Sequence, residues 1–279
     1  MQQNRRIGLG TVQFGMDYGI SNGEGQTSEE EVFSILGCAR KNNIGLLDSA
    51  SAYGNAEEIL GKCGVDSFEI VSKFLPSENG QTITRQLKSS LSNLNQHFIY
   101  GYMAHRPLSL IDQPEYWDEL LELKNTGKVK KIGYSLNTPE ELEKLLAEGM
   151  IPDLVQVPYN YFDRRFENAI EVLKKQDCEV HTRSVFLQGL FFMKPGKLSP
   201  FFDEIKSILE SLQHRGSTLG GDLLNFVLSN KMIDKVIIGV ENKIQLQNNL
   251  IMLQKARQLP EIHNKISDNI LIPSLWPQK

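Results

Sequence analysis

The segment LLDSASAYGNAEEILG, residues 46–61, decides how the rest of the sequence is interpreted. An apolar run ends at Asp48, Tyr53 follows a few residues later, and a helical pattern begins directly afterwards. This order is typical of a β-strand that turns into an α-helix. Asp48 is then either a helix-capping or turn residue, or part of an active site at the carboxyl end of the strand. The segment alone leaves both interpretations open.

Other short apolar runs along the chain have the same character, and longer helical patterns separate them. The sequence predicts strands at residues 6–12, 44–50, 68–74, 99–105, 129–135, 154–160, 178–184 and 234–240. It predicts helices at residues 28–42, 82–95, 115–127 and 139–149. Eight strands, each followed by a helix, indicate the α/β class and a (β/α)8 TIM barrel. We expect a single domain over residues 1–279, with a C-terminal tail at 257–279.

A doubly wound parallel sheet is the alternative fold. That fold usually carries a glycine fingerprint after its first strand, and this chain has Gly8 and Gly10 but Gln13 in the third position. No linker-like composition divides the chain. The stretch 190–217 is longer than a normal connection, so we expect it to form a lid or to carry an extra helix.

Composition and charge argue against several classes of protein. Of the 279 residues, 40% are hydrophobic and 23% are charged, which suits a large core rather than a disordered chain. The net charge is −4 and no Lys/Arg cluster occurs, so nucleic-acid binding is disfavoured. Without a signal-peptide pattern or an apolar run of membrane length, we expect a cytoplasmic protein with no membrane partner. Cys38, Cys63 and Cys178 are predicted to be free, buried thiols, not a disulfide or zinc site.

Polar residues follow three successive predicted strands. Asp48 and Tyr53 follow the second, Lys73 lies near the end of the third, and His105 ends the fourth. A lysine is costly to bury unless it is paired, so Asp48 is its expected partner. The charge of Lys73 would lower the pKa of the Tyr53 hydroxyl and make it a proton donor near neutral pH. His105 would hold a carbonyl oxygen or share the proton transfer. Each residue alone also fits a structural role, but their convergence indicates carbonyl chemistry.

Several motifs extend this pattern along the chain: LGTVQFG, LLDSASAYGNAEEILG, VSKF, YMAHRP, KIGYS, LVQVPYN, RSVFLQGLF and IIGVENKIQLQNNL. In order and spacing the chain resembles the aldo-keto reductase family from residue 7 to about residue 256. The resemblance implies a (β/α)8 barrel and a catalytic tetrad of Asp48, Tyr53, Lys73 and His105, with Tyr53 as the general acid. It implies a nicotinamide cofactor, NADP (NADPH) by default and NAD as the alternative, and no metal.

The resemblance also implies the cofactor-binding positions. These are Thr11, Ser135, Gln156, Arg183, Ser184, Phe186, Gly189, Gly239, Val240, Gln245, Asn248 and Asn249. Ser135 and Gln156 are expected to bind the nicotinamide amide. Many members have asparagine after this serine, whereas this chain has Leu136, and Asn137 is the available substitute. Arg183 is expected to stack on the nicotinamide where many members place an aromatic ring.

The expected site for the 2′-phosphate departs from the family pattern. Many members carry a lysine or arginine there, but this chain has Gly239 and Gln245, with Glu241 close by. Lys243 is the only cation in this part of the sequence. Residues 184–189 are expected to form the pyrophosphate loop. We therefore expect weaker discrimination between NADPH and NADH than a basic pocket would give.

Two classes of function remain open. The first is an NAD(P)H-dependent oxidoreductase that reduces an aldehyde or ketone to an alcohol. The alternative is a cofactor-binding regulatory or vestigial barrel with little turnover. The expected partner is a small-molecule carbonyl substrate, and the chain is expected to be a monomer or a small homo-oligomer. Asn22, Ser77 and Asn79 in the predicted pocket loops would suit a sugar-like substrate. Trp276 in the tail is expected to cover the pocket, pack outside the barrel or be mobile.

Overall fold

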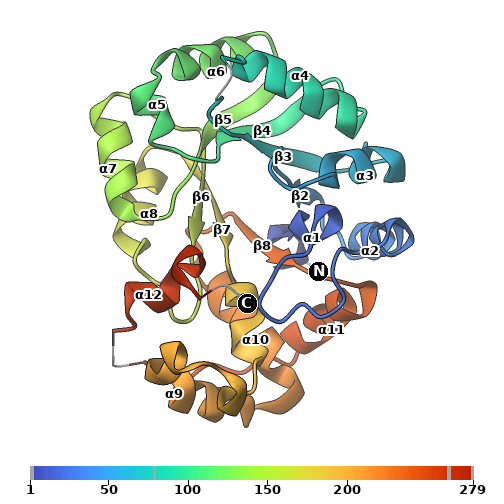
Figure 1. Ribbon diagram of the computed structural model, residues 1–279, viewed down its shortest axis with the longest axis vertical. Helices are drawn as coiled ribbons and strands as arrows, with labels where there is room; N and C mark the ends of the chain where they lie inside the picture. Colours follow the sequence, from blue (N-terminus) through green and yellow to red (C-terminus); the bar gives the residue numbers. More distant parts are fainter. Residues whose placement is uncertain (1–2, 78–79, 263–264, 278–279) are drawn as a thin grey trace.

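The chain folds into a closed barrel of eight parallel strands in sequential order, with helices around it (Figure 1). The computed structural model describes residues 3–77, 80–262 and 265–277, so Asn79 lies outside the described residues. The strands are β1 (Ile7–Gly10), β2 (Leu46–Asp48), β3 (Glu69–Phe74), β4 (Ile99–Ala104), β5 (Val129–Ser135), β6 (Leu154–Pro158), β7 (Glu179–Arg183) and β8 (Lys235–Gly239). Because β8 pairs with β1, the sheet closes on itself. The predicted (β/α)8 barrel is confirmed, and the doubly wound alternative is wrong.

Helices separate the strands as the sequence predicted. They are α1 (Val12–Gly15), α2 (Glu29–Lys41), α3 (Ala56–Cys63), α4 (Ile83–Leu94), α5 (Ser109–Asp112), α6 (Glu115–Asn125), α7 (Pro139–Ala147), α8 (Glu167–Lys175), α9 (Asp203–Gln213), α10 (Leu219–Ser229), α11 (Lys243–Leu253) and α12 (Asp268–Leu271). Hydroxyl side chains begin three of them. Ser28 caps α2, Thr82 caps α4, and Thr138 forms a capping box with Glu141 at α7. These caps bind N–H groups that have no partner within the helix, which fixes where each helix starts.

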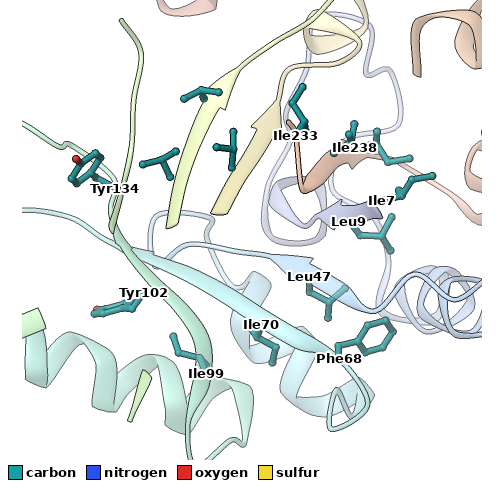
Figure 2. Packing of buried hydrophobic residues seen from close by; sticks show 14 of the residues in the cluster. Ile7, Leu9, Leu47, Phe68, Ile70, Ile99, Tyr102, Tyr134, Ile233 and Ile238 are labelled. Carbon is teal, nitrogen blue, oxygen red and sulfur yellow. The ribbon is translucent and has the colours of Figure 1, made fainter. Parts of the chain in front are cut away.

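Both faces of the barrel sheet are buried. The interior is filled by Leu46, Val71, Met103, Leu154 and Ile237. The outer face packs against the helices and forms the main core, in which Leu47 of β2 and Ile70 of β3 lie side by side (Figure 2). Burial on both faces explains why the strands are apolar along most of their length. The polar side chains at their carboxyl ends are the exceptions.

A second hydrophobic cluster lies beside the barrel. It joins the segment between β7 and α10 to the C-terminal tail, so that α9 and α12 lie on the same side of the molecule (Figure 1). Trp276 packs edge-on against Phe202, with ring centroids 5.3 Å apart, and donates its Nε1–H to the Ile270 carbonyl. The extra helix expected within 190–217 is therefore present as α9. Trp276 packs on this cluster outside the barrel.

The remaining expectations about the fold concern the three cysteines and membrane-spanning helices. Cys38, Cys63 and Cys178 are free thiols, and the first and last are buried. Cys63 is only half-buried, so the expectation of burial is wrong for it, because it is the last residue of α3 and the chain turns at Gly64 directly after it. No helix in the described part of the chain is long and apolar enough to cross a membrane.

Candidate active site

A buried ion pair lies at the carboxyl ends of β2 and β3. Lys73 is completely buried, and its Nζ donates to Oδ2 of Asp48 at 2.8 Å and to the Ser49 carbonyl at 2.8 Å. The other carboxylate oxygen, Oδ1, accepts a 2.8 Å hydrogen bond from Nε2 of Gln156. The partner that the sequence predicted for Lys73 is therefore the one it has.

The surroundings of Lys73 keep it protonated. Burial lowers its pKa, but the Asp48 carboxylate and the Tyr53 hydroxyl together raise it by more, so the pKa lies above the ordinary lysine value. A protonated lysine that is shielded from water can hold a fixed positive charge against a neighbouring oxygen. The oxygen within its reach, besides those of Asp48 and Ser49, belongs to Tyr53.

Tyr53 is held by the turn between β2 and α3. Its backbone N–H donates to the Ala50 carbonyl at 3.0 Å. The next residue, Gly54, has φ +54° and lies so close to Gly15 of α1 that a Cβ atom would be 2.2 Å from the Gly15 carbonyl oxygen. Only glycine fits this contact. The turn thus fixes the Tyr53 ring with its centroid 5.2 Å from Nζ of Lys73.

His105 follows β4 and completes the group. Its ring meets that of Tyr53 edge-to-face, with centroids 5.7 Å apart. Burial, together with the positive charges of Lys73, Arg183 and Arg106, lowers the pKa of His105 to about 3. The imidazole is therefore neutral at physiological pH. Its Nδ1 is buried and has no hydrogen-bond partner among the described residues.

A cavity of about 610 Å³ opens above this group. It extends from Asp48, Tyr53 and Gln156 to Gln245 and the start of α11. Its wall includes eleven of the twelve predicted cofactor-binding residues: Thr11, Gln156, Arg183, Ser184, Phe186, Gly189, Gly239, Val240, Gln245, Asn248 and Asn249. Ser135 is buried and pairs with Gln156 in the sheet, but it does not line the cavity. Neither Lys73 nor His105 lies on the wall.

Two loops meet across the cavity. Residues 184–189 contain Ser184, Leu187, Gln188 and Gly189 with φ values of 65°, 45°, 51° and 87°. The Gln188 carbonyl accepts from the N–H of Ile20 at 3.1 Å, and its side chain donates to the Tyr18 hydroxyl at 2.9 Å. Sequence reasoning missed Tyr18 and Gln188, because a contact across 170 residues leaves no local pattern.

The Arg183 guanidinium extends from the end of β7 to the end of β5. Nη2 donates to the Leu136 carbonyl at 3.0 Å and to Oδ1 of Asn137 at 2.7 Å, and Nη1 donates to Oγ of Ser184 at 3.3 Å. Asn137 thus binds Arg183 and is absent from the cavity wall. Among the described residues that line the cavity, Arg183 is the only lysine or arginine.

The far end of the cavity has an acidic character. Glu241 lies on the wall, and Gln245 binds it twice: Oε1 accepts from the Glu241 N–H at 2.8 Å, and Nε2 donates to Oε2 at 3.0 Å. Glu31 of α2 accepts from the backbone N–H of Lys243 at 2.5 Å, at the first turn of α11. A carboxylate therefore already occupies one of the N–H groups that would attract an anion there.

Comparisons with known proteins agree with this architecture. The model of the Aldo/keto reductase family matches residues 6–271. The chain is 30% identical over 181 residues to aldo-keto reductase YhdN of Bacillus subtilis, a match that covers 59% of this chain and 53% of that protein. It thus spans about half the length of that relative.

Solved structures have the same barrel. One is PA4992 of Pseudomonas aeruginosa, described as an aldo-keto reductase, with a TM-score of 0.68, 25% identity and coverage of 90% of both chains. Another is the holo form of the aldo-keto reductase AKR11C1 from Bacillus halodurans, with a TM-score of 0.72 and 21% identity, covering 91% of this chain and 88% of that one.

Proposed function

Since the chain belongs to the aldo/keto reductase family, we propose that it is an NAD(P)H-dependent oxidoreductase that reduces an aldehyde or a ketone to an alcohol. One observation carries the proposal: the buried Lys73–Asp48 pair lies against Tyr53 at the edge of a ligand-sized cavity. A buried ion pair is weak support for stability, because desolvation offsets much of its attraction. Its position beside a phenol and a neutral imidazole favours a catalytic role.

Each of the four residues has a role that its geometry supports. Asp48 keeps Lys73 charged and in place, and Lys73 holds a positive charge against the Tyr53 oxygen. Tyr53 gives its proton to the carbonyl oxygen as the carbon receives a hydride, so that C–H and O–H bonds replace the carbonyl π bond. Tyr53 is then reprotonated from water. Neutral His105 packs edge-on against the Tyr53 ring and so helps to hold the proton donor in place.

The cavity suits a nicotinamide dinucleotide, which would supply the hydride when bound. Its volume lies within the range of about 300–1,000 Å³ that is usual for ligand sites. Gln13 on the wall has a buried Oε1 without a partner in the described part of the chain, so it offers an acceptor to a bound group. Gln156 gives its amide hydrogen to Asp48, which leaves its oxygen for the nicotinamide amide.

Both NADPH and NADH are candidates. NADPH is the family's usual cofactor, but the wall near α11 presents Glu241, Gln245, Asn248 and Asn249 and no lysine or arginine. Carboxylate and amide groups suit ribose hydroxyls, whereas a phosphate dianion gains most from an arginine fork. We therefore propose weak discrimination between the two cofactors.

The test is a spectrophotometric screen. The purified protein is incubated with NADPH or NADH and a panel of simple aldehydes, sugars and ketones, and the absorbance of the reduced nicotinamide is followed. Oxidation that depends on both substrate and Tyr53 would support the proposal. Tight dinucleotide binding without turnover on any carbonyl would instead favour the cofactor-binding, vestigial alternative.

A further inference from the structure

We propose that Arg183 sets the preference of the site for the reduced over the oxidised form of its cofactor. The inference rests on the proposed function, because it requires a nicotinamide ring in the cavity. It goes beyond that function by assigning Arg183 an electrostatic role. A stacking side chain without charge could not have this role.

The position of Arg183 follows from its hydrogen bonds. Its backbone belongs to β7, and its guanidinium is anchored to Leu136 and Asn137, just past the end of β5. The strand between them, β6, carries Gln156, which also lines the cavity. The guanidinium therefore crosses the cavity wall next to Gln156. A ring that delivers hydride to a carbon beside Tyr53 must come within about 3–3.5 Å of that carbon, which brings it to this wall.

Two further observations support this placement. The charge of Arg183 acts on His105, whose pKa is lowered first by burial, then by Lys73 and then by Arg183. It also opposes the rise in the pKa of Tyr18, which burial and the nearby Tyr53 oxygen cause. The guanidinium thus lies within electrostatic range of residues on two loops that flank Tyr53.

The charge of Arg183 is not cancelled by an ion pair in the described part of the chain. Asp48 and Glu241 are the only acidic residues among the described ones that line the cavity. Asp48 is neutralised by Lys73, and Glu241 lies at the opposite end beside Gln245. His105 is neutral. The nicotinamide end of the cavity therefore has a net positive charge.

This charge distinguishes the two redox states of the cofactor. An oxidised nicotinamide ring carries a positive charge, and a reduced ring is neutral. A cation on the wall beside the ring therefore weakens binding of the oxidised form and leaves binding of the reduced form almost unaffected. At an effective dielectric constant between those of a protein surface and water, the expected difference is on the order of tenfold in the ratio of dissociation constants. The oxidised product would then leave more readily.

The test measures binding and not turnover. Dissociation constants of the oxidised and reduced forms, of both NADP and NAD, are determined by titration calorimetry for the wild type, Arg183→Gln and Arg183→Lys. In Arg183→Gln the ratio of oxidised to reduced dissociation constants should fall about tenfold, chiefly because the oxidised form binds more tightly. That change corresponds to about 30 mV in the midpoint potential of the bound couple. Arg183→Lys retains the charge and should retain most of the ratio.

Arg106→Gln is the matched control. Arg106 also contributes to the low pKa of His105, but it does not line the cavity. Its removal should leave the ratio unchanged within about twofold, since an exposed charge is screened by water. A similar fall in the ratio for Arg106→Gln would show that any nearby positive charge has this effect, and it would overturn the assignment to Arg183.

Two other outcomes would also overturn it. If Arg183→Gln weakens binding of the oxidised and the reduced cofactor equally, the guanidinium binds the cofactor phosphates. If the ratio does not change, Arg183 does not act on the ring. Both results leave the proposed function intact, because the wild type still binds dinucleotides. A wild-type protein that binds neither cofactor would refute the proposed function and this inference together.

Discussion

Replacing Lys73 with methionine should destabilise the protein by about 3–5 kcal/mol. Methionine approximates the shape of the lysine stem but removes its charge. The Asp48 carboxylate, whose side chain is only 5% exposed, would then remain buried with the Gln156 amide as its side-chain donor. A hydrogen bond from a neutral amide compensates only part of the desolvation of an ionised carboxylate.

The double variant Lys73→Met/Asp48→Asn separates the charge effect from the loss of packing. Asparagine fills nearly the same volume as aspartate and is neutral, so about half or more of the lost stability should return. Lys124→Met is the matched control, because Lys124 forms a 2.6 Å ion pair with Asp153 in which both side chains are about one-third exposed. That change should cost less than about 1 kcal/mol.

The measurement is urea unfolding followed by circular dichroism, with the free energy of unfolding extrapolated to water. The slope against urea should be the same in all variants if only stability changes. The reasoning is refuted if Lys73→Met costs less than about 1 kcal/mol, or if the double variant is no more stable than the single one. In either case the buried carboxylate would not depend on Lys73.

Three other changes test the site. Tyr53→Phe should lower kcat roughly 100-fold or more while cofactor dissociation constants stay the same, because only the proton donor is lost; a kcat near that of the wild type would exclude Tyr53 as the acid. Glu241→Gln combined with Gln245→Arg should tighten NADPH binding by roughly tenfold, about 1.4 kcal/mol, and leave NADH binding nearly unchanged; equal effects on both cofactors in titrations would place the 2′-phosphate elsewhere. The pKa of His105 is about 3 in the folded chain and near 6.5 when the side chain is exposed, so the unfolded chain binds the extra proton. The stability of the folded chain should therefore fall as pH drops from 6.5 towards 3. In urea unfolding between pH 6.5 and 4.5, the wild type should lose about 2 kcal/mol more than His105→Gln.

The barrel and the group around Tyr53 could be predicted from the sequence for a physical reason. Strands covered on both faces are apolar along their length, so a lysine or an aspartate at the end of such a strand is conspicuous. In a parallel barrel all carboxyl ends lie on one face, so the strand assignments by themselves bring these side chains together. The pairing of Asp48 with Lys73 required no further information.

The wall of the cavity that residues 184–189 form could not be predicted in the same way. Ser184, Leu187 and Gln188 adopt positive φ, but only Gly189 indicates such a conformation by its residue type. The bond between Gln188 and Tyr18 joins two loops far apart in the sequence, and loops lack the periodicity on which prediction depends. The hydrogen bonds of Arg183 to the end of β5 could not be predicted from the sequence for the same reason.

The second hydrophobic cluster connects the C-terminal tail to residues 184–191, the loop that follows β7 at the cavity. Leu187, Leu190 and Phe191 at the loop pack with Ile266, Ile270 and Leu271 of the tail, in a cluster distinct from the main core but joined to it through Phe186 and Phe226. Such a cluster can unfold as a cooperative unit of its own while the rest of the molecule stays native. Amide hydrogen exchange in the loop would then report the integrity of a tail some 80 residues further along the chain. A protease cut near the C-terminus would free the loop long before it melted the barrel.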